Sequence, residues 1–307
     1  MKKFVLYSVL FLFPILACCV ILEWAVRRIP CSYSVKADYM DRYADRIRIL
    51  VLGSSHAYTG ISPEVLGEDA YSLANFSQTI YYDYRLLRKY ADRCSNLKQV
   101  IMTVSMFSLY SDLEDGDEKD RMVWYSNYFG INRYPWNITS RYQIAAAPKS
   151  LWHKMTAHYL EGEDQVCMSP QGMSTLYTLA NKNKENWDDG ATPAKRHYSN
   201  KLPKETIVED LTKIAALCYD KRITLYLVTL PSRISYREHC DSIQIQRTRL
   251  VIDSLLFRYP NVSYLDYSAD SALTTNPDLF YDADHLSSYG AEIFTRQLKY
   301  RIEEEES

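Results

Sequence analysis

Residues 47–56 read IRILVLGSSH, a short aliphatic run that ends in one glycine and two serines. Such a run, stopped by a turn signal, is typical of a strand that is buried on both faces of a sheet. We therefore expect a central strand here. The two serines and the histidine then lie directly after its carboxyl end.

Four further segments have the character of buried strands, and helical segments alternate with them. The strands are expected at residues 70–74, 100–104, 223–230 and 262–265, and the helices at residues 80–90, 206–219, 243–257 and 288–302. This alternation predicts a parallel α/β sheet with helices on both faces. Ligands of such sheets bind beyond the carboxyl ends of the strands, so functional residues are expected there.

The alternation stops between residues 110 and 204, a stretch that holds four of the five tryptophans. We interpret residues 110–204 as an inserted cap, mostly helical, because a structureless loop of that length is unusual in a compact domain. Its aromatic content favours a surface that meets a partner or a glycan. Residues 303–307 are expected to form a solvated acidic tail.

The N-terminus carries a long apolar segment. Two lysines precede residues 4–22, which carry no charge, and two arginines follow shortly after. The run has about the length of a membrane-spanning helix, so residues 1–28 are predicted to be a membrane anchor. A lipoprotein cleavage site at Cys18 and ordinary signal-peptide cleavage remain alternatives. In each case the rest of the chain lies on the extracytoplasmic side.

The composition excludes several classes of protein. Among the 307 residues, 47% are hydrophobic and 24% are charged, which is typical of a globular chain rather than a disordered one. The net charge of −2 gives no basic footprint for nucleic acid. None of the seven cysteines forms a Cys-x-x-Cys pair, and no histidines have metal-binding spacing. We therefore predict no metal and no cofactor, and mostly free cysteines.

The chemistry is expected at two places in the chain. Ser55 follows the first strand, where a turn exposes a hydroxyl, but a serine needs a base beside it. His285, before the last helix, can be that base, and Asp282 can orient its ring. The structural alternatives are that the serines cap a helix and that Asp282 and Asp284 form a turn. His56 is a second candidate base, although neighbours at a turn usually point apart.

The segments Gly53–His56 and Asp282–His285 together resemble the SGNH/GDSL hydrolase superfamily. In that family the first block reads Gly-Asp-Ser and the last reads Asp-x-x-His. The resemblance implies that Ser55 is the nucleophile, Asp282 the triad acid and His285 the base.

Two of the family's blocks depart from the pattern. The second block supplies an oxyanion-hole glycine, whereas this chain has Asn75–Gln78 there, and the backbone N–H of Ser77 is the candidate donor. The third block should contain an asparagine, and Ser105 stands where it would lie. Losing one oxyanion donor costs ~10²–10³ in rate in other serine hydrolases. Arg233, just past the fourth strand, is a candidate contact for an anionic substrate.

The resemblance covers roughly residues 47–110 and 204–302 and implies a three-layer, flavodoxin-like sheet within residues 29–302. The first block, with serine in place of the family's aspartate, also resembles membrane-anchored extracytoplasmic relatives, which include the D-alanine transfer protein of teichoic acid synthesis and the alginate O-acetylation proteins. The resemblance therefore implies an extracytoplasmic serine esterase or O-acyltransferase that acts on acyl groups of envelope or exported carbohydrate, with a membrane acyl-transfer protein as a partner. The alternative is a catalytically inactive envelope protein that keeps the fold and binds glycan or a partner.

Overall fold

The computed structural model describes residues 2–182 and 185–306, and the chain divides into two compact units. The first unit comprises Met1–Ala37 and Asp117–Val166, and the second comprises Asp38–Gly116 and Cys167–Ser307. The expected insertion is thus divided, because its middle groups with the N-terminal helix and its two ends group with the sheet. Its role as a cap stays a prediction.

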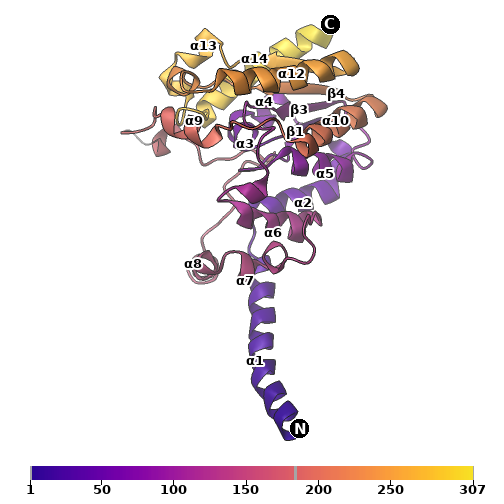
Figure 1. Ribbon diagram of the computed structural model, residues 1–307, viewed down its shortest axis with the longest axis vertical. Coiled ribbons are helices and arrows are strands. Elements are labelled where there is room, and N and C mark those ends of the chain that lie inside the picture. The colour runs from indigo at the N-terminus through magenta and orange to yellow at the C-terminus, as the bar shows by residue number, and fades with distance from the viewer. Residues whose placement is uncertain (1, 183–184, 307) are drawn as a thin grey trace. The chain divides into compact units, whose positions relative to one another are not determined.

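The first unit is helical. Its longest helix, α1 (Lys2–Arg27), is the one helix in the described part of the chain that is long and apolar enough to cross a membrane, and a signal sequence would meet the same criteria. The short helices α6 (Met122–Trp124), α7 (Gln143–Ala146) and α8 (Pro148–Tyr159) lie around its C-terminal end (Figure 1). Helix α2 (Ser32–Tyr43) begins in this unit and ends in the second.

The second unit is built on a five-stranded sheet in the order β2-β1-β3-β4-β5, with every neighbouring pair parallel. The strands are β1 (Ile49–Leu52), β2 (Ala70–Ser72), β3 (Gln99–Thr103), β4 (Thr224–Thr229) and β5 (Val262–Asp266). All five lie where the aliphatic runs predict them. The order 2-1-3-4-5 is that of flavodoxin-like sheets, so the predicted fold class is confirmed.

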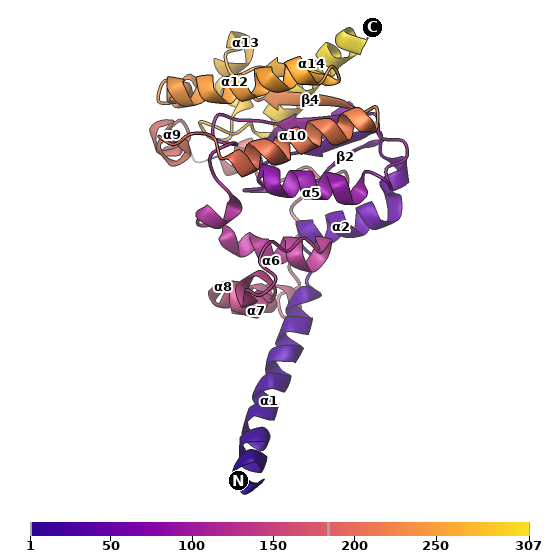
Figure 2. The same cartoon turned by 45° about the vertical axis from the view of Figure 1, so that its right-hand side comes forward.

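Helices cover both faces of this sheet. Helices α5 (Ile80–Tyr90), α10 (Glu205–Asp220) and α12 (Ser242–Arg258) lie together on one face (Figure 2). Helices α3 (Ser55–Gly60), α4 (Pro63–Leu66) and α14 (Ser288–Glu306) pack together on the other. The remaining helices are α9 (Ala191–His197), α11 (Ile234–Arg237) and α13 (Ser271–Thr274).

The core explains why the central strand β1 is aliphatic throughout. Leu50, Val51 and Leu52 of β1 are completely buried, because the sheet has a helical layer on each side. On the α14 side, Phe294 and Leu298 belong to one apolar cluster with β1, β3, β4 and β5. All seven cysteines, each within the described residues, are free.

The C-terminal end differs from the prediction. Residues 303–306 are exposed, as expected of a solvated acidic segment, but they form the last turn of α14, and residue 307 lies outside the described residues. Arg301 forms ion pairs with two of the glutamates along the helix. Glu306 also accepts hydrogen bonds from Gln99 Nε2 at 2.6 Å and from the Tyr226 hydroxyl at 3.1 Å. These contacts keep the acidic segment helical.

Candidate active site

The turn after β1 requires a glycine. Gly53 has a φ of 127°, and a Cβ atom at this position would lie 2.2 Å from Thr103 Oγ1. The Gly53 N–H donates to Asp83 Oδ1 at 2.9 Å, which holds the turn against α5. The chain thus passes sharply from the strand into α3, and Ser55 is the first residue of that helix.

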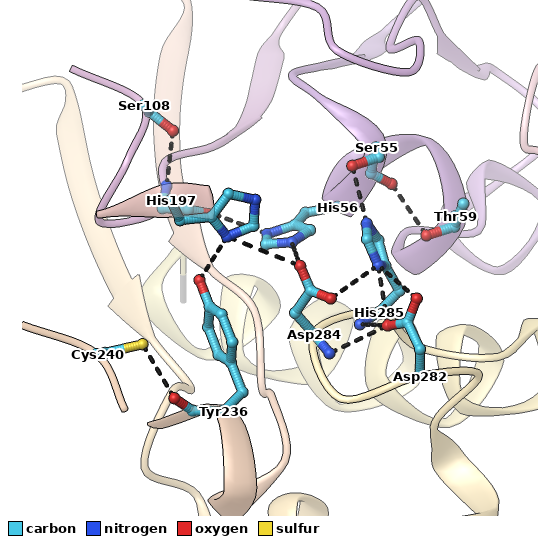
Figure 3. Close-up of polar contacts among 11 residues, drawn as sticks. Ser55, His56, Thr59, Ser108, His197, Tyr236, Cys240, Asp282, Asp284 and His285 are labelled. Atoms are coloured by element: carbon cyan, nitrogen blue, oxygen red, sulfur yellow. Dashed lines mark hydrogen bonds and ion pairs between the residues drawn. The ribbon is translucent and has the colours of Figure 1, made fainter. Parts of the chain in front are cut away.

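The Ser55 hydroxyl faces a histidine from a distant part of the chain. Ser55 Oγ lies 2.9 Å from His285 Nε2, across a separation of 230 residues in the sequence (Figure 3). Ser54 occupies the N-cap position of α3, but its side chain makes no capping hydrogen bond. Neither serine therefore acts as a side-chain cap of α3: Ser54 makes no capping hydrogen bond, and the Ser55 hydroxyl contacts the His285 imidazole.

Asp282 holds the other side of the His285 ring. Its carboxylate oxygens lie 3.0 and 3.1 Å from His285 Nδ1. The backbone N–H groups of Asp284 and His285 donate to Asp282 Oδ1 at 3.1 and 2.8 Å, so the turn itself orients the carboxylate. A proton on Nδ1 leaves the Nε2 lone pair facing Ser55. This is the geometry of a serine, a base and an orienting acid.

A second carboxylate reaches the same ring. Asp284 is only 4% exposed, and its Oδ1 lies 3.3 Å from His285 Nδ1. Its Oδ2 lies 3.5 Å from His56 Nε2, so this carboxylate stands between two histidines (Figure 3). Sequence reasoning treated Asp284 as a turn former, although an acid directly before the histidine is a signal that could have found it.

The charges of the site follow from this arrangement. Burial lowers the pKa of His285, but the carboxylates of Asp284 and Asp282 outweigh burial and raise that pKa above its usual value. Burial raises the pKa of Asp284, but His285 and His56 outweigh it and hold the pKa well below its usual range. Burial lowers the pKa of His56, and it lowers the pKa of His197 to about 3. Of these three histidines, His285 therefore binds a proton most readily.

His56 and Ser105 face each other. His56 Nδ1 lies 2.8 Å from Ser105 Oγ, and the Ser105 N–H donates to Ser108 Oγ at 2.9 Å. The ring of His56 is thus directed toward the end of β3, whereas Ser55 is directed toward His285. The His56 ring nevertheless lies 4.9 Å from the His285 ring, so the two neighbours have different hydrogen-bond partners but reach the same cluster. Ser105, the candidate oxyanion donor, has its hydroxyl against His56.

The two remaining candidates lie in loops. Ser77, in the loop after β2, has a φ of 55°, a left-handed conformation that glycine adopts readily and serine rarely. In a loop segment, residues 75–78, that contains no glycine, Ser77 thus has the backbone conformation that glycine favours. Arg233 is held within the protein, because its guanidinium donates to both carboxylate oxygens of Asp188 at 3.2 and 3.1 Å and to the Thr274 carbonyl at 2.9 Å.

Among the described residues, one group of metal-ligating side chains lies close together, namely His56, Asp284 and His285. Both ring nitrogens of His285 already have partners in Ser55 and Asp282. A cation that used His285 would therefore have to displace one of these contacts, so the group is better suited to an inhibitory metal than to a resident one.

A cavity of about 730 Å³ borders the site. It opens at the carboxyl ends of β3, β4 and β5, between α11 and α12, and His56, Ser105 and Asp284 contribute to its wall. Its volume is within the range of small-molecule pockets, and its place at the strand ends is where such sheets bind ligands.

No protein-family model matches the chain, and no curated protein matches it in sequence. Among solved structures, it is similar to a GDSL-like lipase from Bacteroides thetaiotaomicron, at 11% identity and a TM-score of 0.43, over 89% of this chain and 97% of the other. It is also similar to a lipase/acylhydrolase from Enterococcus faecalis, at 12% identity and a TM-score of 0.36, over 83% and 97% of the two chains. The strand order and the site geometry themselves define a flavodoxin-like α/β protein with a serine–histidine–aspartate arrangement at its strand ends.

Proposed function

We propose that the protein is a serine esterase or O-acyltransferase of the SGNH/GDSL type. The observation that supports this most directly is the 2.9 Å contact between Ser55 Oγ and His285 Nε2, with Asp282 behind the ring. A serine hydroxyl becomes nucleophilic when a base accepts its proton, and a carboxylate on the far ring nitrogen stabilises the imidazolium that forms.

The reaction proceeds in two halves. In the first, Ser55 Oγ attacks the acyl carbonyl carbon while its proton passes to His285 Nε2. The tetrahedral intermediate then collapses, the bond to the leaving alkoxide breaks, and the alkoxide takes the proton from His285. In the second, water or a carbohydrate hydroxyl gives its proton to His285 and attacks the acyl-serine, and the proton returns to Ser55. Asp282 and Asp284 stabilise the imidazolium in both halves.

The oxyanion that forms at the carbonyl needs hydrogen-bond donors. We assign this role to the backbone N–H of Ser77 and to the N–H groups at the start of α3. Ser105 and Arg233 are further candidates for substrate contact. Each first has to leave its present partner, which is His56 for Ser105 and Asp188 for Arg233.

The substrate and the location are proposed from the resemblance and from α1. Helix α1 anchors the protein in a bacterial membrane, and the second unit works on the extracytoplasmic face. The acyl groups come from, or pass to, envelope or exported carbohydrate, with a membrane acyl-transfer protein as the donor partner. The length and apolar character of α1 support the anchor, and its basic N-terminal flank supports the orientation.

The test compares two neighbouring serines in the full-length protein in detergent. Ser55→Ala should reduce hydrolysis of p-nitrophenyl acetate to the level of buffer, because the nucleophile is lost. Ser54→Ala is the matched control and should retain activity, because Ser54 makes no capping hydrogen bond. A second assay offers the same donor with a carbohydrate acceptor and detects the acylated sugar by mass spectrometry. If wild type and Ser55→Ala behave alike in both assays, the catalytic proposal fails and the inactive glycan-binding alternative takes its place.

A further inference from the structure

The first unit exposes several large apolar side chains beyond the apolar stretch of α1. Six of them are between 49% and 94% exposed, namely Trp24, Trp136, Ile138, Trp152, Tyr159 and Leu160. Single exposed apolar residues are normal on a protein surface, but these six lie in α1 or in segments that contact its C-terminal end directly or through α7. We call these six residues the aromatic collar.

The collar lies at the level where the apolar stretch of α1 ends. The Tyr159 hydroxyl donates to the Ala25 carbonyl at 2.8 Å. Arg27 Nη2 donates to the Arg141 carbonyl at 2.8 Å, which fixes the segment that carries Trp136 and Ile138 beside the same turn of the helix. The α7–α8 region therefore lies against the C-terminal end of α1 (Figure 1).

The buried carboxylate of Glu23 joins the end of α1 to the start of α7. Glu23 is 7% exposed and pairs with Arg27 at 2.6 Å. It also accepts hydrogen bonds from the backbone N–H groups of Gln143 and Ile144, both at 3.1 Å. An acidic side chain next to an apolar helix is costly unless its charge is paired, and here it is fully paired.

The side-chain types of the collar and the cations near it are those found at the interface between a lipid bilayer and water. Tryptophan and tyrosine are enriched at the boundary between lipid acyl chains and headgroups, because one end of each ring is apolar and the other polar. Arginine and lysine side chains near helix ends extend toward the headgroups. Arg28 lies over the ring of Trp24, a collar residue, at 4.0 Å, and Lys154 lies 5.9 Å from the ring of Trp124 in the same unit.

We propose that the aromatic collar sits in the interfacial layer of the bilayer that α1 crosses, with phospholipid headgroups and upper acyl chains as its partner. This inference rests on the anchor role proposed above for α1. It gives the tryptophan-rich residues 117–166 a membrane-seating function, which differs from a cap over the substrate.

The test uses the full-length protein in phosphatidylcholine vesicles whose acyl chains are brominated near the headgroup. Variants that retain one tryptophan each, at Trp24, Trp136, Trp152 or Trp187, have the others replaced by phenylalanine. Bromine quenches indole emission only at short range. We expect the lipid to reduce emission from Trp24, Trp136 and Trp152, while Trp187, in the second unit, retains its emission and serves as the matched control.

The two proposals fail in different ways. If brominated lipid quenches Trp24 while Trp136 and Trp152 respond only to aqueous iodide, the anchor stands and the collar proposal is wrong. If the lipid leaves Trp24 unquenched as well, the anchor fails and the collar fails with it. Unaltered protein provides a measurement that does not depend on the variants folding. A photoactivatable phosphatidylcholine should then label peptides within residues 134–160, and labelling confined to α1 would contradict the collar.

Discussion

Two carboxylates compete for one ring nitrogen of His285, and replacing each by asparagine separates their contributions. Asp282 lies 3.0 Å from Nδ1 and Asp284 lies 3.3 Å from it. Either one can accept the Nδ1–H and hold the ring toward Ser55. We therefore expect Asp282→Asn and Asp284→Asn to be partly redundant, and the double variant to be far worse than their product.

The magnitude follows from the strength of a charge-assisted hydrogen bond, about 1.5–3 kcal/mol. When one carboxylate remains, the loss is at the lower end, and about 1.5 kcal/mol corresponds to roughly a tenfold fall in kcat/KM. Without both, the ring loses its orientation and its counter-charge, and removal of the orienting acid from a serine-protease triad costs about 10⁴. The excess over two independent tenfold losses is about 10², or close to 3 kcal/mol of coupling.

The pH profile provides a second readout. The two carboxylates raise the pKa of His285 against the opposing effect of burial, and only the neutral ring accepts a proton from Ser55. Activity should therefore appear only as the pH rises through this elevated pKa. Removing Asp284 lowers the pKa of His285, so the acidic limb of kcat/KM moves to lower pH.

The assay is hydrolysis of p-nitrophenyl acetate across the neutral and alkaline range, with thermal unfolding recorded for each variant. Asp278→Asn is the matched control, because it removes one exposed carboxylate from the preceding turn without touching His285. The reasoning is refuted if the single losses multiply to give that of the double variant. It is also refuted if the acidic limb of Asp284→Asn stays where it is in wild type.

Three further outcomes follow from contacts near the site. Burial raises the pKa of Asp83 to about 7, so the folded state keeps this proton to higher pH than the unfolded chain does. As the pH rises from about 4 to about 7, the free energy of unfolding should therefore fall by roughly 1.4 kcal/mol per pH unit. Asp83→Asn should remove this part of the pH dependence in thermal unfolding experiments. Gly53→Ala should cost about 1–3 kcal/mol of stability, and Thr103→Ala should restore only part of it because the positive φ remains. Added Zn²⁺ should inhibit hydrolysis reversibly with EDTA, and His56→Ala should weaken the inhibition, whereas Mg²⁺, which prefers oxygen ligands, should have no effect.

Each of these has a contradicting result. An unfolding profile of Asp83→Asn parallel to that of wild type through the neutral range would show that the carboxyl does not stay protonated in the fold. Full rescue of Gly53→Ala by the second substitution would show that steric contact alone, and not the backbone conformation, demands glycine. Zn²⁺ inhibition that is unchanged in His56→Ala would place the cation elsewhere.

Much of the sheet could be predicted from the sequence because β1, β3 and β4 each contain a run of apolar residues. The run at residues 223–230 corresponds to β4 at Thr224–Thr229, and the run at 47–53 corresponds to β1 at Ile49–Leu52. The C-terminal end of α14 could not be predicted from apolar residues. An acidic segment has no apolar periodicity, and its helical state depends on contacts of Glu306 with Gln99 and Tyr226 from two other strands.

The site was only partly readable. Ser55, Asp282 and His285 were identified from local spacing and from a resemblance, and the structure brings their side chains together. The position of Asp284 directly before the histidine is a signal in the sequence, but only the fold shows that its carboxylate reaches both His285 and His56. The partner of His56 was also out of reach, because Ser105 approaches it from a different strand.

The amino-acid sequence alone determined the alternating strands and helices, the apolar N-terminal helix and the chemical groups available for catalysis. These are local properties, encoded by the character of a few neighbouring residues. Only the tertiary structure decided that one carboxylate lies between two histidines, that the pKa of His285 is raised, and that residues 117–166 of the expected insertion group with α1. The pKa of a side chain and its contacts depend on burial and on groups that are far apart in the sequence. No single segment of the sequence therefore determines them.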